Sequence, residues 1–137
     1  MLDLFQPEIA DDQRAQRRVR EWIAALRGGE YAQGAGYLRR PEGFCCLGVA
    51  CDLFDDSLWR QSEQGAGWVY LDVVLDLPKQ VRDAYRVRRP DGQYTKDDGY
   101  SASLAGDNDS GKSFAEIAEL IEAELEATLS AAREARR

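Results

Sequence analysis

Residues Gly106–Ser113 read GDNDSGKS and match the phosphate-loop pattern GxxxxGK[ST] at every fixed position. In such a loop, glycines turn backbone N–H groups inward, the lysine contacts the β- and γ-phosphates, and the hydroxyl holds Mg²⁺. An amphipathic segment follows, so a helix N-terminus would face the bound anion. Nucleotide binding through Lys112 and Ser113 is therefore one interpretation of this segment.

Three features of this segment and of the residues on either side of it favour a structural role over nucleotide binding. Asp107 and Asp109 would place two carboxylates around a triphosphate, and like charges repel. The preceding residues 100–105, YSASLA, are not the apolar run expected of a buried parallel strand. The residues after Ser113 form one helical pattern and leave no length for further parallel strands. We therefore predict a turn, after which Ser113 caps a helix and Glu116 completes an S-x-x-E capping box.

The residue types predict no metal site, no cofactor and no catalytic residue. The two aspartates of the segment fit the start of a calcium-loop spacing, but Ala118 stands where the closing glutamate is needed. The chain has no histidine, which removes Ser–His and Cys–His pairs and the most frequent zinc ligand. Cys45, Cys46 and Cys51 have no cation adjacent in sequence, so we interpret them as small buried residues.

The composition is that of one globular domain. The chain has 137 residues, of which 44% are hydrophobic and 31% charged. No apolar run is long enough to span a membrane and the N-terminus lacks a signal-peptide pattern, so we expect a cytosolic protein. A net charge of −7 disfavours general nucleic-acid binding, which depends on clustered Lys and Arg.

The charges are unevenly distributed along the chain. Acidic residues concentrate in residues 41–85 and 100–137, which could face a basic partner. Arg86, Arg88 and Arg89 form a basic cluster, and this cluster is a second candidate for phosphate contacts beside Lys112 and Ser113. We expect residues 86–99, which are polar and rich in turn formers, to be a mobile loop.

Hydrophobic spacing predicts long amphipathic helices near both termini. The first begins after Asp11 or Asp12 and ends near Arg27. The last begins at Ser113 and keeps its apolar face to about Leu129.

The middle of the chain contains shorter elements. We predict a hairpin or turn around residues 39–43, a buried helix within Phe44–Phe54, a strand at Trp68–Leu71 and a short helix from Pro78 through Tyr85. The fold class is therefore α+β, mainly helical, with a short β-hairpin or small antiparallel sheet. We expect one globular domain over residues 11–130, a flexible N-terminus over 1–10 and a frayed tail over 131–137.

Three segments together resemble a known group of proteins. These are residues 22–34 with the pattern WxxALxxGxYxQG, residues 44–53 with FCCLGVACDL, and residues 108–122 with NDSGKSFAEIAELIE. Their order is similar to that in small uncharacterised proteins of bacteriophages and mobile elements, which have a "CCLGVLCD" centre and an "LND-G-SF-EIA-LIE" end. The resemblance implies a phage or prophage origin and a small cytosolic domain. It brings no known activity and no catalytic residue.

We expect a non-enzymatic phage or prophage accessory protein that binds a host protein, with inhibition of a defence system as one use. Trp59, Tyr94 and Tyr100 are the candidate partner-binding residues, because aromatic side chains exposed on loops anchor interfaces. The alternative is a protein that sequesters a small molecule or nucleotide through the arginine cluster or the GDNDSGKS segment. An enzyme that uses carboxylate, tyrosine or cysteine chemistry has the least support.

Overall fold

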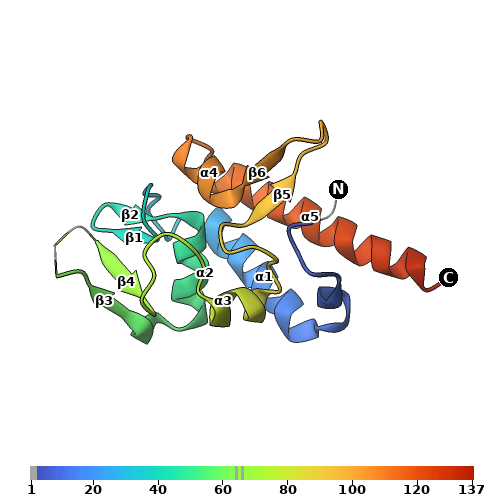
Figure 1. Ribbon diagram of the computed structural model, residues 1–137, viewed down its shortest axis with the longest axis horizontal. Coiled ribbons are helices and arrows are strands. Elements are labelled where there is room, and N and C mark those ends of the chain that lie inside the picture. Colours follow the sequence, from blue (N-terminus) through green and yellow to red (C-terminus); the bar gives the residue numbers. More distant parts are fainter. Residues whose placement is uncertain (1–2, 64, 66) are drawn as a thin grey trace.

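The computed structural model describes residues 3–63, 65 and 67–137 and confirms a small, mainly helical α+β domain. Three pairs of short antiparallel strands lie beside helices that surround a common core (Figure 1). In chain order the described elements are η1 (Pro7–Asp11), α1 (Gln13–Arg27), β1 (Arg39–Arg40), β2 (Gly43–Phe44), α2 (Cys46–Phe54), η2 (Asp56–Leu58), β3 (Trp59–Gln61), β4 (Trp68–Tyr70), α3 (Lys79–Tyr85), β5 (Gln93–Thr95), β6 (Ser101–Ser103), α4 (Leu104–Asp109) and α5 (Phe114–Ala135).

Helices α1 and α5 pack against each other, as their apolar faces predict (Figure 1). Helix α1 begins where the Asp12 carboxylate accepts the amide N–H of Ala15 at 3.0 Å, which satisfies one of the free donors at the helix start. Charged residues flank the apolar contact: Arg20 pairs with Glu126 at 3.1 Å, and Arg27 pairs with Glu122 at 3.0 Å. Part of the acidic charge of α5 is therefore neutralised by α1.

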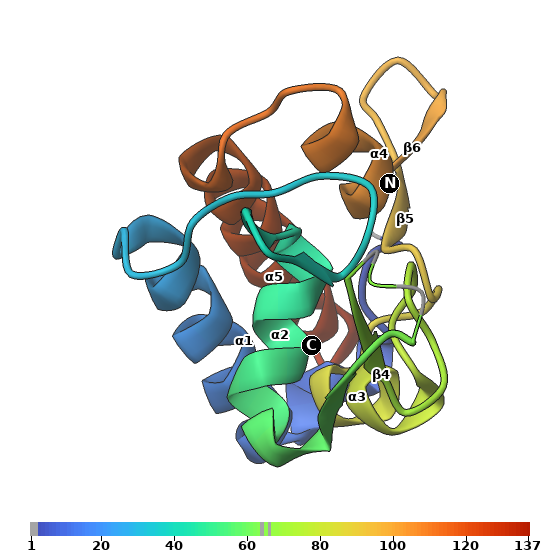
Figure 2. The ribbon, with the colours of Figure 1, turned by 90° about the vertical axis from the view of Figure 1, so that its left-hand side faces the viewer.

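Helix α2 lies in the core, and its small residues explain why. Every residue from Cys46 to Cys51 is buried. Two aromatic side chains donate hydrogen bonds to its backbone: the indole N–H of Trp22 to the Cys46 carbonyl at 2.9 Å, and the hydroxyl of Tyr85 to the Ala50 carbonyl at 3.0 Å. The predicted buried helix is confirmed. Figure 2 shows the segment after α1 passing over the N-terminal end of α2.

The three strand pairs are short and differ in how well the sequence predicts them. The hairpin around residues 39–43 is confirmed, with Arg39 opposite Phe44. The strand at Trp68 is confirmed as β4, but its antiparallel partner β3 was not predicted. Strand β5 lies within residues 86–99, the segment expected to be a mobile loop, and pairs with β6, which follows that segment.

Residues 3–10 pack into the domain, although a flexible N-terminus over residues 1–10 was expected; residues 1 and 2 lie outside the described residues. Leu4, Phe5 and Ile9 are fully buried. Phe5 pairs with Val87 through an isolated antiparallel β-bridge, and the amide N–H of Gln6 donates to the Arg86 carbonyl at 2.8 Å. The segment that follows α3 therefore holds the N-terminal segment in place. At the other end, α5 continues to Ala135, beyond the predicted end of its apolar face.

We searched the described residues for membrane-spanning helices and for groups of metal-binding side chains. In residues 3–63, 65 and 67–137, no helix is long and apolar enough to cross a membrane. The same residues contain no group of three or more histidine, cysteine, aspartate or glutamate side chains placed to hold a metal ion.

Candidate functional site

The GDNDSGKS segment joins two helices. Its first half is part of α4, where a turn was expected, because the Ser103 hydroxyl caps that helix by accepting the amide N–H of Gly106 at 2.9 Å. Only residues 110–113 separate α4 from α5. The predicted capping box is confirmed: Ser113 Oγ accepts the amide N–H of Glu116 at 3.1 Å, and the Glu116 carboxylate accepts the amide N–H of Ser113 at 3.0 Å.

Asn108, in the same segment, connects three parts of the chain. Its side-chain N–H donates to the Gly34 carbonyl at 2.8 Å, and its Oδ1 accepts the amide N–H of Cys46 at 3.2 Å. Oδ1 also accepts from the side chain of Gln33 at 3.0 Å, and Gln33 accepts the amide N–H of Phe114 at 3.0 Å. The residues that carry the family resemblance thus fix the connection between α1 and β1 against α2 and α5.

Two substitutions separate a helix cap from a phosphate-binding segment. Ser113→Ala should lower the free energy of unfolding by about 1 kcal/mol, because the Glu116 N–H loses its acceptor. Lys112→Ala should change it by less than about 0.5 kcal/mol, because the lysine side chain is exposed and, among the described residues, only the backbone of Lys112 forms hydrogen bonds. Urea unfolding of both variants measures the difference. A larger loss for Lys112→Ala than for Ser113→Ala would contradict the cap assignment.

The three arginines predicted to form a basic cluster, Arg86, Arg88 and Arg89, differ in exposure and in their partners. Arg86 Nε pairs with the Asp12 carboxylate at 3.0 Å, whereas Arg88 and Arg89 are exposed. The hydrogen bonds from Ala15 and Arg86 lower the pKa of Asp12. The side chain of Arg86 therefore holds α1 to the end of α3 and is only partly available to a ligand.

The three aromatic residues predicted to bind a partner also differ in how far they are exposed. Tyr100 is 72% exposed at the β5–β6 turn and Trp59 is half-buried. Tyr94 is 5% exposed, and its hydroxyl donates to the Asp107 carboxylate. The expectation of an exposed Tyr94 is wrong, because β5 turns this side chain toward the core.

The cysteines have the environment of core residues. Cys45, Cys46 and Cys51 are free and buried. Burial raises the pKa of Cys45 to about 11 and raises the pKa values of Cys46 and Cys51 further. All three thiols therefore stay protonated near neutral pH, and a protonated thiol is a poor nucleophile.

An arginine and three aromatic rings meet at the surface, and of these four residues only Trp59 is a candidate from the sequence. The guanidinium of Arg39 lies 3.9 Å from the ring centre of Trp68, 5.0 Å from that of Phe44 and 5.5 Å from that of Trp59. We call these four residues the arginine–aromatic cluster. Arg39 forms no ion pair within the described part of the chain. Neighbouring Arg40 lies over the Tyr37 ring at 4.6 Å.

Two strand pairs and one carboxylate position these rings. The pairing of β1 with β2 puts Arg39 opposite Phe44, and the pairing of β3 with β4 puts Trp59 beside the same surface. Asp52, near the end of α2, accepts the Trp59 indole N–H at 3.0 Å and the Tyr31 hydroxyl at 2.6 Å. Edge-to-face contacts of Phe44 with Tyr31 and Trp59 complete the arrangement.

The β1–β2 hairpin separates two hollows in the surface. One, of about 320 Å³, is lined by residues that include Arg39, Phe44 and Trp68. The other, of about 520 Å³, includes Asn108 and Asp109. Arg40 and Glu42 line both, and these two side chains form an exposed pair at 3.6 Å. The surface can therefore offer a cation, a flat aromatic wall and a recess to one ligand.

A family described as a domain of unknown function, DUF8296, matches residues 15–125. The chain belongs to this family. The DUF8296 region begins in α1, ends in α5 and includes both the arginine–aromatic cluster and Asn108. Comparison with curated proteins and with solved structures found no match.

Proposed function

We propose that this DUF8296 domain is a non-enzymatic binding protein that recognises an acidic segment of a partner protein through the arginine–aromatic cluster. The observation that carries the proposal is the guanidinium of Arg39, which lies against three aromatic rings and has no carboxylate partner in the described residues.

The stacking of Arg39 supports a binding role on energetic grounds. A guanidinium held over aromatic faces has already lost much of its side-chain freedom, so little more entropy is lost when it binds. Its planar fork of N–H donors matches the two oxygens of a carboxylate. Trp and Arg are also the residue types that contribute most often to the binding energy of protein interfaces.

Arg40 adds a second cation beside the cluster. Its pair with Glu42 is exposed and 3.6 Å long, and such pairs contribute little to stability. A carboxylate of the partner can therefore compete with Glu42 for Arg40.

The biological setting is part of the same proposal. The resemblance to phage and mobile-element proteins supports a phage or prophage accessory protein, present in the host cytosol, with a host protein as its partner. Inhibition of a host defence system is the use that fits a small accessory protein of this kind. The nucleotide alternative receives less support, because Ser113 serves as a helix cap and Arg86 is paired with Asp12.

The proposal predicts which single substitution removes binding. Affinity capture from a bacterial host lysate, quantified by mass spectrometry, compares the unchanged protein with Arg39→Ala and with Arg20→Ala. Arg20 is the matched control because it is an exposed arginine on α1, already paired with Glu126. We expect Arg39→Ala to lower the affinity for the captured partner by about tenfold or more, while Arg20→Ala leaves it unchanged. Equal capture by both variants would overturn the proposal.

A further inference from the structure

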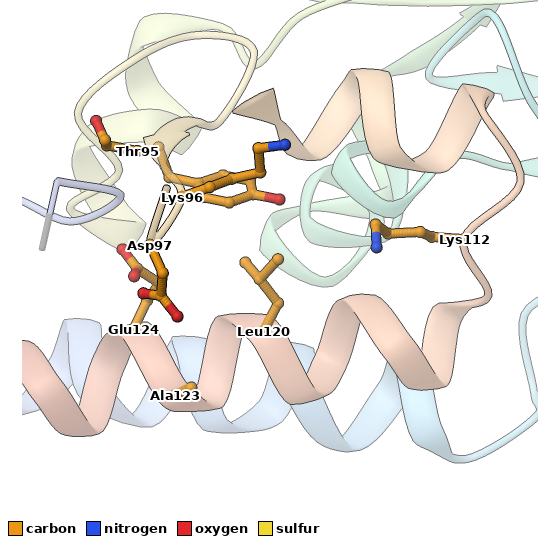
Figure 3. A pocket seen from close by; sticks show the side chains of 8 residues that line it. Thr95, Lys96, Asp97, Lys112, Leu120, Ala123 and Glu124 are labelled. Carbon is orange, nitrogen blue, oxygen red and sulfur yellow. The ribbon is translucent and has the colours of Figure 1, made fainter. Parts of the chain in front are cut away.

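A third hollow lies away from the β1–β2 hairpin, between the β5–β6 hairpin and α5 (Figure 3). Its volume is about 320 Å³, at the lower end of the range for small-molecule sites. Lys96 and Asp97 border it from the hairpin, Leu120 and Glu124 from α5, and Lys112 from the connection before α5. The Tyr94 ring forms part of its wall.

Two lysines supply positive charge to this hollow. The backbone of Lys112 is held at both sides, since its N–H donates to the Asp107 carbonyl at 3.0 Å and its carbonyl accepts from Gln33 at 2.8 Å. Its ammonium forms no ion pair within the described ranges, and that of Lys96 has only an exposed contact with Asp98 at 3.7 Å. Figure 3 shows Lys96 above Leu120 and Lys112 extending from the α4–α5 connection toward the hairpin, with both ammonium groups away from Asp97 and Glu124.

Two carboxylates stand on the other side of Leu120. Figure 3 shows Asp97 and Glu124 next to each other there. Glu124 is held in place by the amide N–H of Leu4, which donates to it at 3.2 Å. Burial, and to a lesser extent the charges of Asp3 and Asp97, raises the pKa of Glu124. A cation bound between the adjacent carboxylates of Asp97 and Glu124 would reduce their mutual repulsion. Asp97 forms no ion pair with any described residue.

We propose that this hollow binds a small zwitterion of the amino-acid class, with its carboxylate between Lys96 and Lys112 and its ammonium between Asp97 and Glu124. The carbon chain of the ligand would lie on Leu120. Both ends of the hollow then receive the opposite charge, and no charged group is left without a partner. A polyphosphate is disfavoured, because its negative charge would lie close to Asp97 and Glu124.

An amide-resolved NMR titration tests this directly. The probes are amino acids with increasing separation of the two charges, from glycine to longer ω-amino acids, and the controls are a carboxylic acid and an amine of the same chain lengths. We expect one zwitterion to shift the amide signals of residues 95–97 and 120–124, with an affinity about tenfold above that of either control. Absence of shifts at millimolar concentration, or equal binding of the controls, would overturn the proposal.

Charge-removing variants locate the ligand. Lys112→Gln and Glu124→Gln should each weaken binding of that zwitterion by about tenfold, whereas Arg20→Gln should leave it unchanged. Glutamine at position 124 keeps an oxygen acceptor for the Leu4 N–H, so the fold is retained. Unchanged affinity in both hollow variants would place the ligand elsewhere and contradict the assignment. The result is independent of partner binding at the arginine–aromatic cluster.

Discussion

Replacement of Gly48 by alanine should lower the free energy of unfolding by about 3 kcal/mol, because the new methyl group has no space. A Cβ at this position would lie 1.9 Å from the carbonyl oxygen of Leu38 and 2.7 Å from its carbonyl carbon. Leu38 cannot easily move, since its N–H donates to the Val74 carbonyl at 2.7 Å and its carbonyl accepts from Cys45 at 3.1 Å. Urea unfolding followed by circular dichroism measures the loss.

Gly106→Ala is the matched control for this prediction. Gly106 also lies in a helix, but it is exposed, and a Cβ there would meet only the Ser103 hydroxyl at 3.0 Å. Alanine is the better helix former by about 1 kcal/mol, and this gain offsets the cost of the close contact with the Ser103 hydroxyl. We therefore expect little net change in stability. If Gly48→Ala were tolerated as well as Gly106→Ala, the close packing of α2 against the β1 segment would be incorrect.

Removal of the Asn108 side chain should cost a further large amount of stability, again about 3 kcal/mol. Asn108 is 3% exposed and joins Gly34 to Cys46 by hydrogen bonds. Asn108→Ala leaves a buried carbonyl and a buried N–H without partners, and each such group costs about 1–3 kcal/mol. Thermal and urea unfolding of the variant check the prediction.

The neighbouring residue provides the comparison. Asp109 is exposed and accepts the amide N–H of Gly36 at 2.9 Å. Water can replace that bond, so Asp109→Ala should cost less than about 1 kcal/mol. Equal losses for the two variants would mean that Asn108 does not act as the central connection between residues 33–36 and α2.

The helices are predictable from the sequence because their signals are local. Asp12 and Ser113 are capping residues immediately before apolar periodic segments, and both cap as predicted. Helix α4 escapes prediction because Gly106 is a weak helix former. Its end is instead held by tertiary hydrogen bonds from Asn108. The burial of Leu4 and Phe5 also depends on distant residues, here those after α3.

The arginine–aromatic cluster could not be predicted from local sequence patterns, because it is formed by residues that lie far apart along the chain. Arg39 belongs to an Arg–Arg–Pro turn and looks like a solvated charge in the sequence. Trp68 lies far from it along the chain and meets it only after the β1–β2 and β3–β4 strands have paired. Trp59, which was selected from the sequence, is part of the cluster. The concentration of aromatic residues between Tyr31 and Tyr70 is a signal that could have indicated this region, but it was not used in the prediction.

Selection of peptides from a displayed host proteome tests the central claim most directly. The claim is that the cluster around Arg39 recognises an acidic segment of a partner protein. We predict that the selected peptides are enriched in Asp and Glu, that their affinity falls as salt rises, and that Arg39→Ala abolishes the enrichment while Arg20→Ala does not. Selection of neutral or basic peptides, or an enrichment that persists in Arg39→Ala, would contradict the account.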